Sequence, residues 1–258
     1  MTDAIKPIFP NAVTMMALAF GVSSINMALW GKWEFAVMFI MLAGFFDFMD
    51  GRVARALGVS SKFGAELDSL SDFVSFGVAP GFLMYNWTMD STMRIEAFRN
   101  IVYRPNAVGL YWGVVLFFAV CCATRLARFN TMLDERQPKY WTHFFMGVPA
   151  PAGGGLAMLP LILWIATDEK IALFRAPWFV SCFVIFAGVM MASRVPTLSL
   201  KHLHPSRDMR SVLMFVMLGF ICGLATLPWQ TLGLLGLGYL ISIPVSIFYF
   251  LHFKKESA

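Results

Sequence analysis

The chain has 258 residues, of which 59% are hydrophobic and 14% charged, and its mean hydropathy is +0.69. Soluble domains contain roughly 45–50% apolar and about 25% charged residues, so this composition excludes a soluble globular protein and indicates an integral membrane protein. The net charge of +5 suits contact with the anionic headgroups of membrane lipids and gives no reason to expect a nucleic-acid partner.

The apolar runs predict the helices that cross the membrane, each needing about 20 mostly apolar residues. We expect an all-α integral membrane protein with about eight transmembrane helices, at residues 12–30, 33–57, 66–87, 107–128, 146–167, 175–193, 211–228 and 231–252. A segment rich in glycine and proline, 147–155, predicts an irregular start for the fifth of them. No shift in composition marks a domain boundary, so residues 1–258 are expected to form a single transmembrane domain.

The distribution of basic residues predicts the orientation of these helices. With the N-terminus in the cytoplasm, 14 of the 20 lysines and arginines lie on the cytoplasmic side and 6 on the other. An even number of spans returns the C-terminus to the cytoplasm. We therefore expect a protein of the bacterial inner membrane, with both termini and the acidic run described next on its cytoplasmic side.

Four aspartates recur at helical spacing where the second span ends and the third begins. Asp47 and Asp50 are three residues apart, and Asp68 and Asp72 are four apart, so each pair shares a helix face. Ionisable side chains at membrane depth are costly and indicate function, although a single interfacial aspartate can also be a helix cap. The short connection predicts that the two helices are antiparallel neighbours. Four converging carboxylates repel one another unless cations intervene, and Mg²⁺ or Mn²⁺ prefer oxygen ligands.

Small residues accompany the aspartates at positions that favour ligand binding. Gly51 and Ala54 follow Asp50 by one and four positions, and Gly64 precedes Asp68 by four. They leave bare helix surfaces on which a flat nucleobase or ribose can lie, although close helix packing would also explain Gly51 and Ala54. Arg55 adds a forked donor for a phosphate or carboxylate.

Residues 47–72 resemble the signature of the CDP-alcohol phosphotransferase family, D-x2-D-G-x2-A-R-x8-G-x3-D-x3-D, and match it without a gap or substitution. The resemblance implies transfer of a phosphatidyl group from a CDP-linked lipid to a hydroxyl, with CMP leaving. It also implies a homodimer with six core helices per subunit and two divalent cations, Mg²⁺ or Mn²⁺.

The resemblance further implies a role for each residue of the signature. The metal ligands would be Asp47, Asp50, Asp68 and Asp72. The residues around the CDP moiety would be Asp50, Gly51, Ala54, Arg55 and Gly64. Asp72 would also act as the catalytic base that removes the proton of the incoming hydroxyl, a task that suits a nearby carboxylate.

The acceptor alcohol is predicted from the end of the fourth span. Arg125, Arg128 and Asn130 lie there, and the two arginines are one turn apart. They suit an acceptor with a carboxylate, or a lipid phosphate, although anchoring on the cytoplasmic side would explain them equally well. Segments 125–130 (RLARFN) and 145–151 (F-x-G-x-P-x-P) resemble the branch of the family that uses serine. We therefore expect CDP-diacylglycerol and L-serine as substrates.

Other acceptors and one other class of protein stay open. Choline usually requires an aromatic cage, and inositol and glycerol 3-phosphate are further alternatives within the family. A divalent-cation transporter would also place carboxylates in a membrane. The sequence disfavours it because no repeat is evident and because the polar residues gather at one membrane face, whereas transporter sites lie near the midplane.

Overall fold

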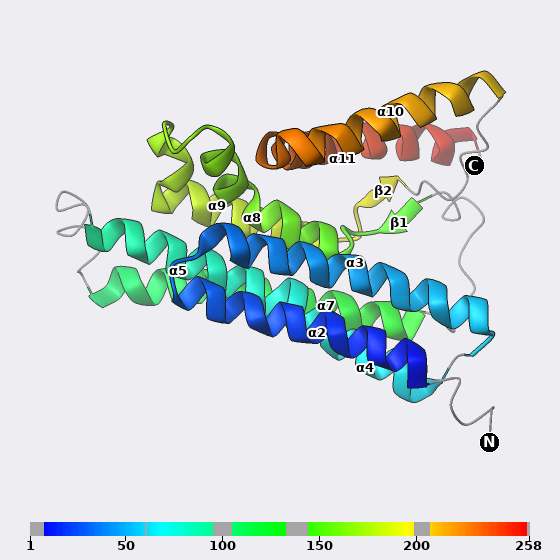
Figure 1. Cartoon of the computed structure of the whole chain (residues 1–258), viewed down its shortest axis with the longest axis horizontal. Coiled ribbons are helices and arrows are strands. Elements are labelled where there is room, and N and C mark those ends of the chain that lie inside the picture. Colours follow the sequence, from blue (N-terminus) through cyan, green and yellow to red (C-terminus); the bar gives the residue numbers. More distant parts are fainter. Residues whose placement is uncertain (1–7, 60, 95–104, 133–143, 199–206, 257–258) are drawn as a thin grey trace.

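The structure is a computed structural model that describes residues 8–59, 61–94, 105–132, 144–198 and 207–256. These residues are mostly helical (Figure 1). The helices are α2 (Ile8–Leu29), α3 (Trp33–Leu57), α4 (Lys62–Asp72), α5 (Ala79–Arg94), α7 (Pro105–Met132), α8 (Ala150–Ala166), α9 (Pro177–Ala192), α10 (Arg207–Thr226) and α11 (Pro228–Glu256). A π-helical turn, η1 (Phe73–Val78), joins α4 to α5, and a 3-10 turn, η3 (Ala172–Arg175), precedes α9.

Each predicted span coincides with a helix or a helical run, which confirms an all-α membrane protein. The run formed by α4, η1 and α5 replaces the single third span that was predicted at 66–87. Within the part of the chain that the structure describes, three segments are long and apolar enough to cross a membrane: Ile8–Leu29, Gly109–Thr131 and Pro228–Phe250. Shorter apolar helices cover Ala150–Ala166, Pro177–Ala192 and Val212–Thr226. Side chains of α10 from Val212 to Cys222 are exposed, as expected for a surface that faces lipid.

The helices run roughly along the long axis of the molecule and are stacked in layers across it (Figure 1). Helices α2, α3, α5 and α7 lie together, α8 and α9 cover them, and the α10–α11 pair lies beyond α8. Phe76 of η1, Trp87 of α5 and Phe118 of α7 are fully buried in this core. Small residues allow the close approaches: a Cβ added to Gly21 would lie 2.9 Å from the Cα of Ser75. The turn η1 is thereby held directly against α2.

Two short strands, which the sequence did not predict, precede α8 and follow α9. Strand β1 (Phe144–Met146) pairs antiparallel with β2 (Pro196–Leu198). Gly147 follows β1 with a φ of +76°, and a Cβ there would lie 2.8 Å from the carbonyl oxygen of Ser193. Both observations call for glycine at this position. The predicted irregular entry into the fifth span is confirmed, and its cause is this strand pair.

Candidate active site

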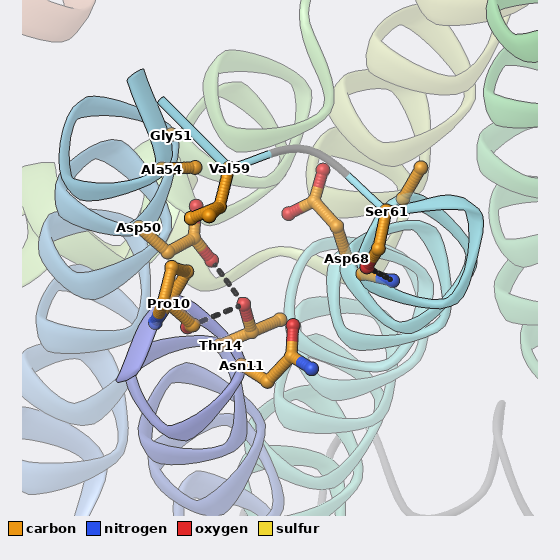
Figure 2. Close-up of a pocket in the computed structure, with 11 residues that line it drawn as sticks. Pro10, Asn11, Thr14, Asp50, Gly51, Ala54, Val59, Ser61 and Asp68 are labelled. Carbon is orange, nitrogen blue, oxygen red and sulfur yellow. Dashed lines mark hydrogen bonds between the residues drawn. The ribbon is translucent and has the colours of Figure 1, made fainter. Parts of the chain in front are cut away.

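The loop between α3 and α4 brings the two acidic segments to one end of the bundle. Helix α3 stops at Gly58, whose φ of +63° is left-handed. Helix α4 starts at Ser61, whose hydroxyl oxygen accepts a hydrogen bond from the Gly64 N–H at 2.9 Å, a typical N-cap. Helix α3 contacts the third predicted helical run through η1 and α5, whereas α4 itself packs mainly on α2. Helix α2 packs against both acidic helices, and a pocket lies between α3 and α4 (Figure 2).

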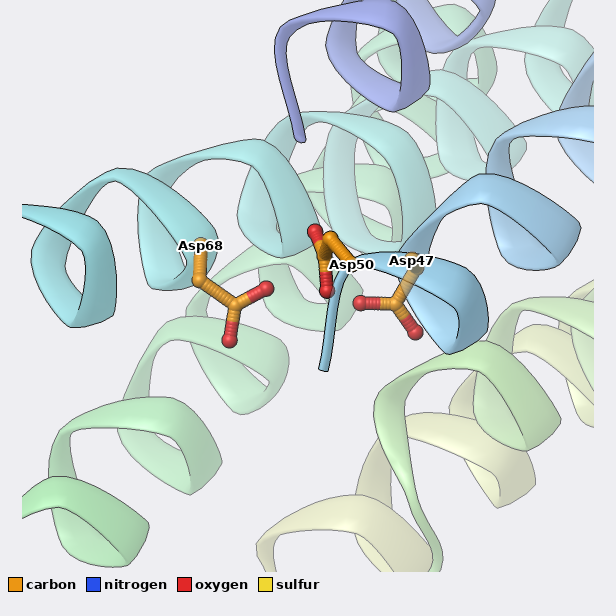
Figure 3. A group of neighbouring side chains, drawn as sticks. All are labelled: Asp47, Asp50 and Asp68. Atoms are coloured by element: carbon orange, nitrogen blue, oxygen red, sulfur yellow. The ribbon is translucent and has the colours of Figure 1, made fainter. Parts of the chain in front are cut away.

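The four aspartates converge beside this pocket. Asp47, Asp50 and Asp68 each place a carboxylate oxygen within 4.8 Å of those of the other two (Figure 3). Asp50 is buried, and Asp47 and Asp68 are half-buried. Asp72 lies one turn beyond Asp68 on α4 and within electrostatic range of Asp47. Negative charges this close and this poorly solvated repel strongly, so the arrangement calls for a compensating cation.

The donor set fits a hard divalent cation. All donors are carboxylate oxygens, the ligand type that Mg²⁺, Mn²⁺ and Ca²⁺ prefer. The Oδ1 atom of Asp72 is also buried and has no hydrogen-bond partner among the described residues. Buried polar atoms without a partner are rare in folded proteins, and a bound ion satisfies such an atom. The cluster can therefore hold a metal ion.

The pocket beside the aspartates has a volume of about 180 Å³ and walls from three helices (Figure 2). Its lining residues are Pro10, Asn11, Thr14, Asp50, Gly51, Ala54, Val59, Ser61, Gly64, Ala65 and Asp68. A Cβ on Gly51 would meet only the Arg55 side chain, at 3.9 Å, so Gly51 faces open space and close helix packing does not explain it. A Cβ on Gly64 would lie 3.0 Å from Oδ1 of Asn11. Three predicted small residues thus line one pocket, and Arg55 is exposed beside it.

Thr14 of α2 belongs to the site, although it was not among the residues predicted from the sequence. Its hydroxyl donates to Oδ2 of Asp50 at 2.6 Å, while the carbonyl oxygen of Pro10 lies farther away at 3.2 Å. The Ser71 hydroxyl donates to the backbone oxygen of Thr14 at 3.3 Å. Thr14 therefore connects α2 to both acidic helices and fixes one carboxylate. Its signal in the sequence was weak, a single hydroxyl on an apolar helix.

The three residues predicted to bind the acceptor are not brought to one place. Arg125 is half-buried and lies within electrostatic range of Asp72 and Asp47. Arg128 donates from Nη1 to the carbonyl oxygen of Ala192 at 2.7 Å, at the end of α9. Asn130 donates from Nδ2 to the Ser69 hydroxyl at 2.9 Å, which ties α7 to α4. Arg125 is therefore the one of these three residues whose guanidinium acts electrostatically on the aspartates.

Comparison with known proteins agrees with this geometry. The family described as CDP-alcohol phosphatidyltransferase matches residues 7–248. The chain belongs to this family. A relative from Mycobacterium leprae, named CDP-diacylglycerol–serine O-phosphatidyltransferase, is 33% identical over 249 residues, covering 93% of this chain and 74% of the relative.

Proteins of the same name from other organisms also resemble the chain. The one from Helicobacter pylori is 31% identical over 191 residues, covering 73% of this chain and 70% of the relative. The one from Methanocaldococcus jannaschii is 36% identical over 141 residues, covering 55% of this chain and 54% of the relative. The resemblance first drawn from residues 47–72 thus extends over most of the chain, and the protein is a membrane phosphatidyltransferase.

Proposed function

We propose that the protein transfers the phosphatidyl group of CDP-diacylglycerol to the hydroxyl of L-serine and releases CMP. The convergence of Asp47, Asp50 and Asp68, with Asp72 one turn further along α4, beside a pocket with glycine and alanine walls carries this proposal. Serine as the acceptor is supported by the names of the relatives and by Arg125, whose guanidinium suits a carboxylate.

We place two divalent cations, Mg²⁺ or Mn²⁺, among Asp47, Asp50, Asp68 and Asp72. When bound, such ions supply positive charge to a pyrophosphate as its bond to the leaving group breaks. The aspartates hold them with oxygen ligands from two helices. Thr14 keeps one of these ligands, Asp50, in a single orientation through its 2.6 Å hydrogen bond.

The CDP moiety lies in the pocket between α3 and α4. The side-chain-free surfaces of Gly51 and Gly64, with Ala54, leave room for the flat cytosine base. Asp50 lies at the floor of the same pocket. Arg55, exposed beside Gly51, donates its forked hydrogen bonds to a phosphate. These residues position the phosphorus that carries the diacylglycerol next to the aspartates.

The acceptor approaches from the side of α7. Arg125 binds the serine carboxylate, and Asp72 removes the proton of the serine hydroxyl. The hydroxyl oxygen forms a bond to the phosphorus that carries the diacylglycerol. The bond from that phosphorus to the bridging oxygen breaks, and CMP leaves with this oxygen, without a covalent enzyme intermediate. Arg128 and Asn130 hold the end of α7 in place through Ala192 and Ser69.

We further propose that the enzyme is a homodimer in a bacterial inner membrane, with its active site and both termini in the cytoplasm. The excess of lysine and arginine on that side supports the orientation. Nucleotide-activated lipids and free serine are both reached from there. Labelling of single introduced cysteines from either side of the membrane tests the orientation.

The proposed reaction is tested with purified protein in detergent, CDP-diacylglycerol and Mn²⁺ or Mg²⁺. Serine, choline, inositol and glycerol 3-phosphate are supplied separately, and CMP and lipid products are measured. We expect release with serine alone and its loss in Asp72→Asn. Glu66→Gln, an exposed carboxylate on the same helix, serves as the matched control and should stay active.

Two results contradict the proposal in different ways. Release with another alcohol and not with serine would keep the chemistry and overturn the acceptor. No release with any alcohol, together with Mn²⁺ flux into liposomes that hold the protein, would favour a transporter.

A further inference from the structure

Three buried polar atoms, one on an aspartate of the site and two on α7 and α11, have no hydrogen-bond partner among the described residues. They are Oδ1 of Asp72, Nε of Arg125 and the hydroxyl of Tyr239. They come from α4, α7 and α11, three helices far apart in the sequence. Arg125 lies within electrostatic range of both Asp72 and Tyr239. Since buried polar atoms are almost always paired, these three groups share a need for a ligand.

Helix α11 is held so that Tyr239 faces into the bundle. A Cβ on Gly236 would lie 2.6 Å from Cδ1 of Leu159, so α11 packs tightly on α8 at this point. Tyr239 follows Gly236 by three positions and shares its helix face. Tyr249, ten residues further along α11, is 50% exposed. Tyr239 is thus half-buried with its hydroxyl oxygen buried, whereas Tyr249 is exposed.

The unpaired atoms match the groups of a hydroxy amino acid. A carboxylate can accept two hydrogen bonds from an arginine fork, and Nε is one of the fork's two donors when the carboxylate binds side-on. A tyrosine hydroxyl adds a third donor. Asp72, the proposed base for the alcohol proton, also lies within electrostatic range of Arg125. An acceptor that carries both groups can therefore engage Arg125 and Tyr239 through its carboxylate and Asp72 through its hydroxyl.

We propose that Tyr239 donates a hydrogen bond to the carboxylate of the acceptor beside Arg125, and so selects an alcohol that carries a carboxylate. This inference rests on the proposed function, since it assumes serine as the acceptor. It assigns α11 a direct part in specificity. Choline and inositol have no anionic group to accept this bond. When either of them binds, the Tyr239 hydroxyl and the Arg125 guanidinium stay buried without a partner, and this free-energy cost disfavours their binding.

The test compares Tyr239→Phe with Tyr249→Phe, the exposed tyrosine of the same helix. Steady-state rates are measured with serine and with serine methyl ester, which lacks the anionic carboxylate. In Tyr239→Phe we expect the KM for serine to rise about tenfold, as for loss of one hydrogen bond to a charged group. The preference for serine over the ester, as a ratio of kcat/KM values, should fall by a similar factor. The KM for CDP-diacylglycerol and the Mn²⁺ requirement should not change, and Tyr249→Phe should match the wild type.

An unchanged preference for serine over the ester in Tyr239→Phe overturns the inference, whatever happens to the rate. This ratio does not depend on the fraction of folded enzyme, so a partly unfolded variant still gives a clear answer. A parallel rise in the KM values of both substrates would indicate a structural role and also overturn it. Absence of any serine-dependent CMP release by the wild type would instead overturn the proposed function.

Discussion

Replacing Thr14 with valine isolates the contact that holds Asp50. Valine keeps the shape of the side chain and removes the hydroxyl, so the 2.6 Å hydrogen bond to Oδ2 of Asp50 is lost. Thr14 and Asp50 are only 4% and 6% exposed, so water cannot easily replace the bond. A hydrogen bond to a charged group contributes about 1.5–3 kcal/mol. Loss of a residue that orients a metal ligand typically lowers metal affinity about 10–100-fold.

The assay is CMP release from CDP-diacylglycerol and serine as a function of Mn²⁺ concentration. For Thr14→Val we expect the half-saturating Mn²⁺ concentration to rise about 10–100-fold. Thr14→Ser keeps the hydroxyl and should retain most of the wild-type affinity for Mn²⁺. Ser24→Ala is the control: Ser24 is buried on the same helix, but its hydroxyl donates to the carbonyl oxygen of Gly21 at 2.8 Å. An unchanged Mn²⁺ dependence in Thr14→Val, or an equal rise in Ser24→Ala, would refute the reasoning.

The packing and the charges lead to three further predictions. Arg128→Met should lower the melting temperature, because the carbonyl oxygen of Ala192 at the end of α9 loses its hydrogen-bond donor. It should leave the KM for serine unchanged, whereas Arg125→Met should raise that KM. Gly21→Ala should destabilise the protein by about 1–3 kcal/mol, because its Cβ would press on Ser75. Gly109 has open space around it, so Gly109→Ala should be nearly neutral. A thermal unfolding assay compares the two variants. A chelator such as EDTA should abolish CMP release, and added Mn²⁺ or Mg²⁺ should restore it; activity that persists after exhaustive chelation would contradict the metal assignment.

The helices and the acidic frame were predictable because both depend on local spacing. Apolar runs of membrane length determine where helices form, and intervals of three and four residues place Asp47 with Asp50 and Asp68 with Asp72 on shared faces. The strict spacing of Gly51 and Gly64 relative to the aspartates likewise predicted a bare pocket wall, and both residues line the pocket.

Features that depend on which helices pack together were not predictable from one sequence. Thr14 and Asp50 are 36 residues apart, and Arg128 and Ala192 are 64 apart. Helix α2 lies against both α3 and α4, a packing that the spacing within the two acidic segments does not indicate. Tyr239 was missed for the same reason, since only the close approach of α11 to α8 turns it inward. The strands β1 and β2 are three residues each and lie in segments without a clear β pattern.

The central claim is that the serine hydroxyl oxygen forms its new bond to the phosphorus that carries the diacylglycerol, and an oxygen label tests it most directly. The enzyme is supplied with CDP-diacylglycerol, Mn²⁺ and L-serine that carries ¹⁸O in its side-chain hydroxyl, and both products are examined by mass spectrometry. The account predicts one ¹⁸O in phosphatidylserine, at the new phosphoester bond, and none in CMP. Label in CMP, or CMP formed from serine-containing reactions without labelled phosphatidylserine, would contradict it.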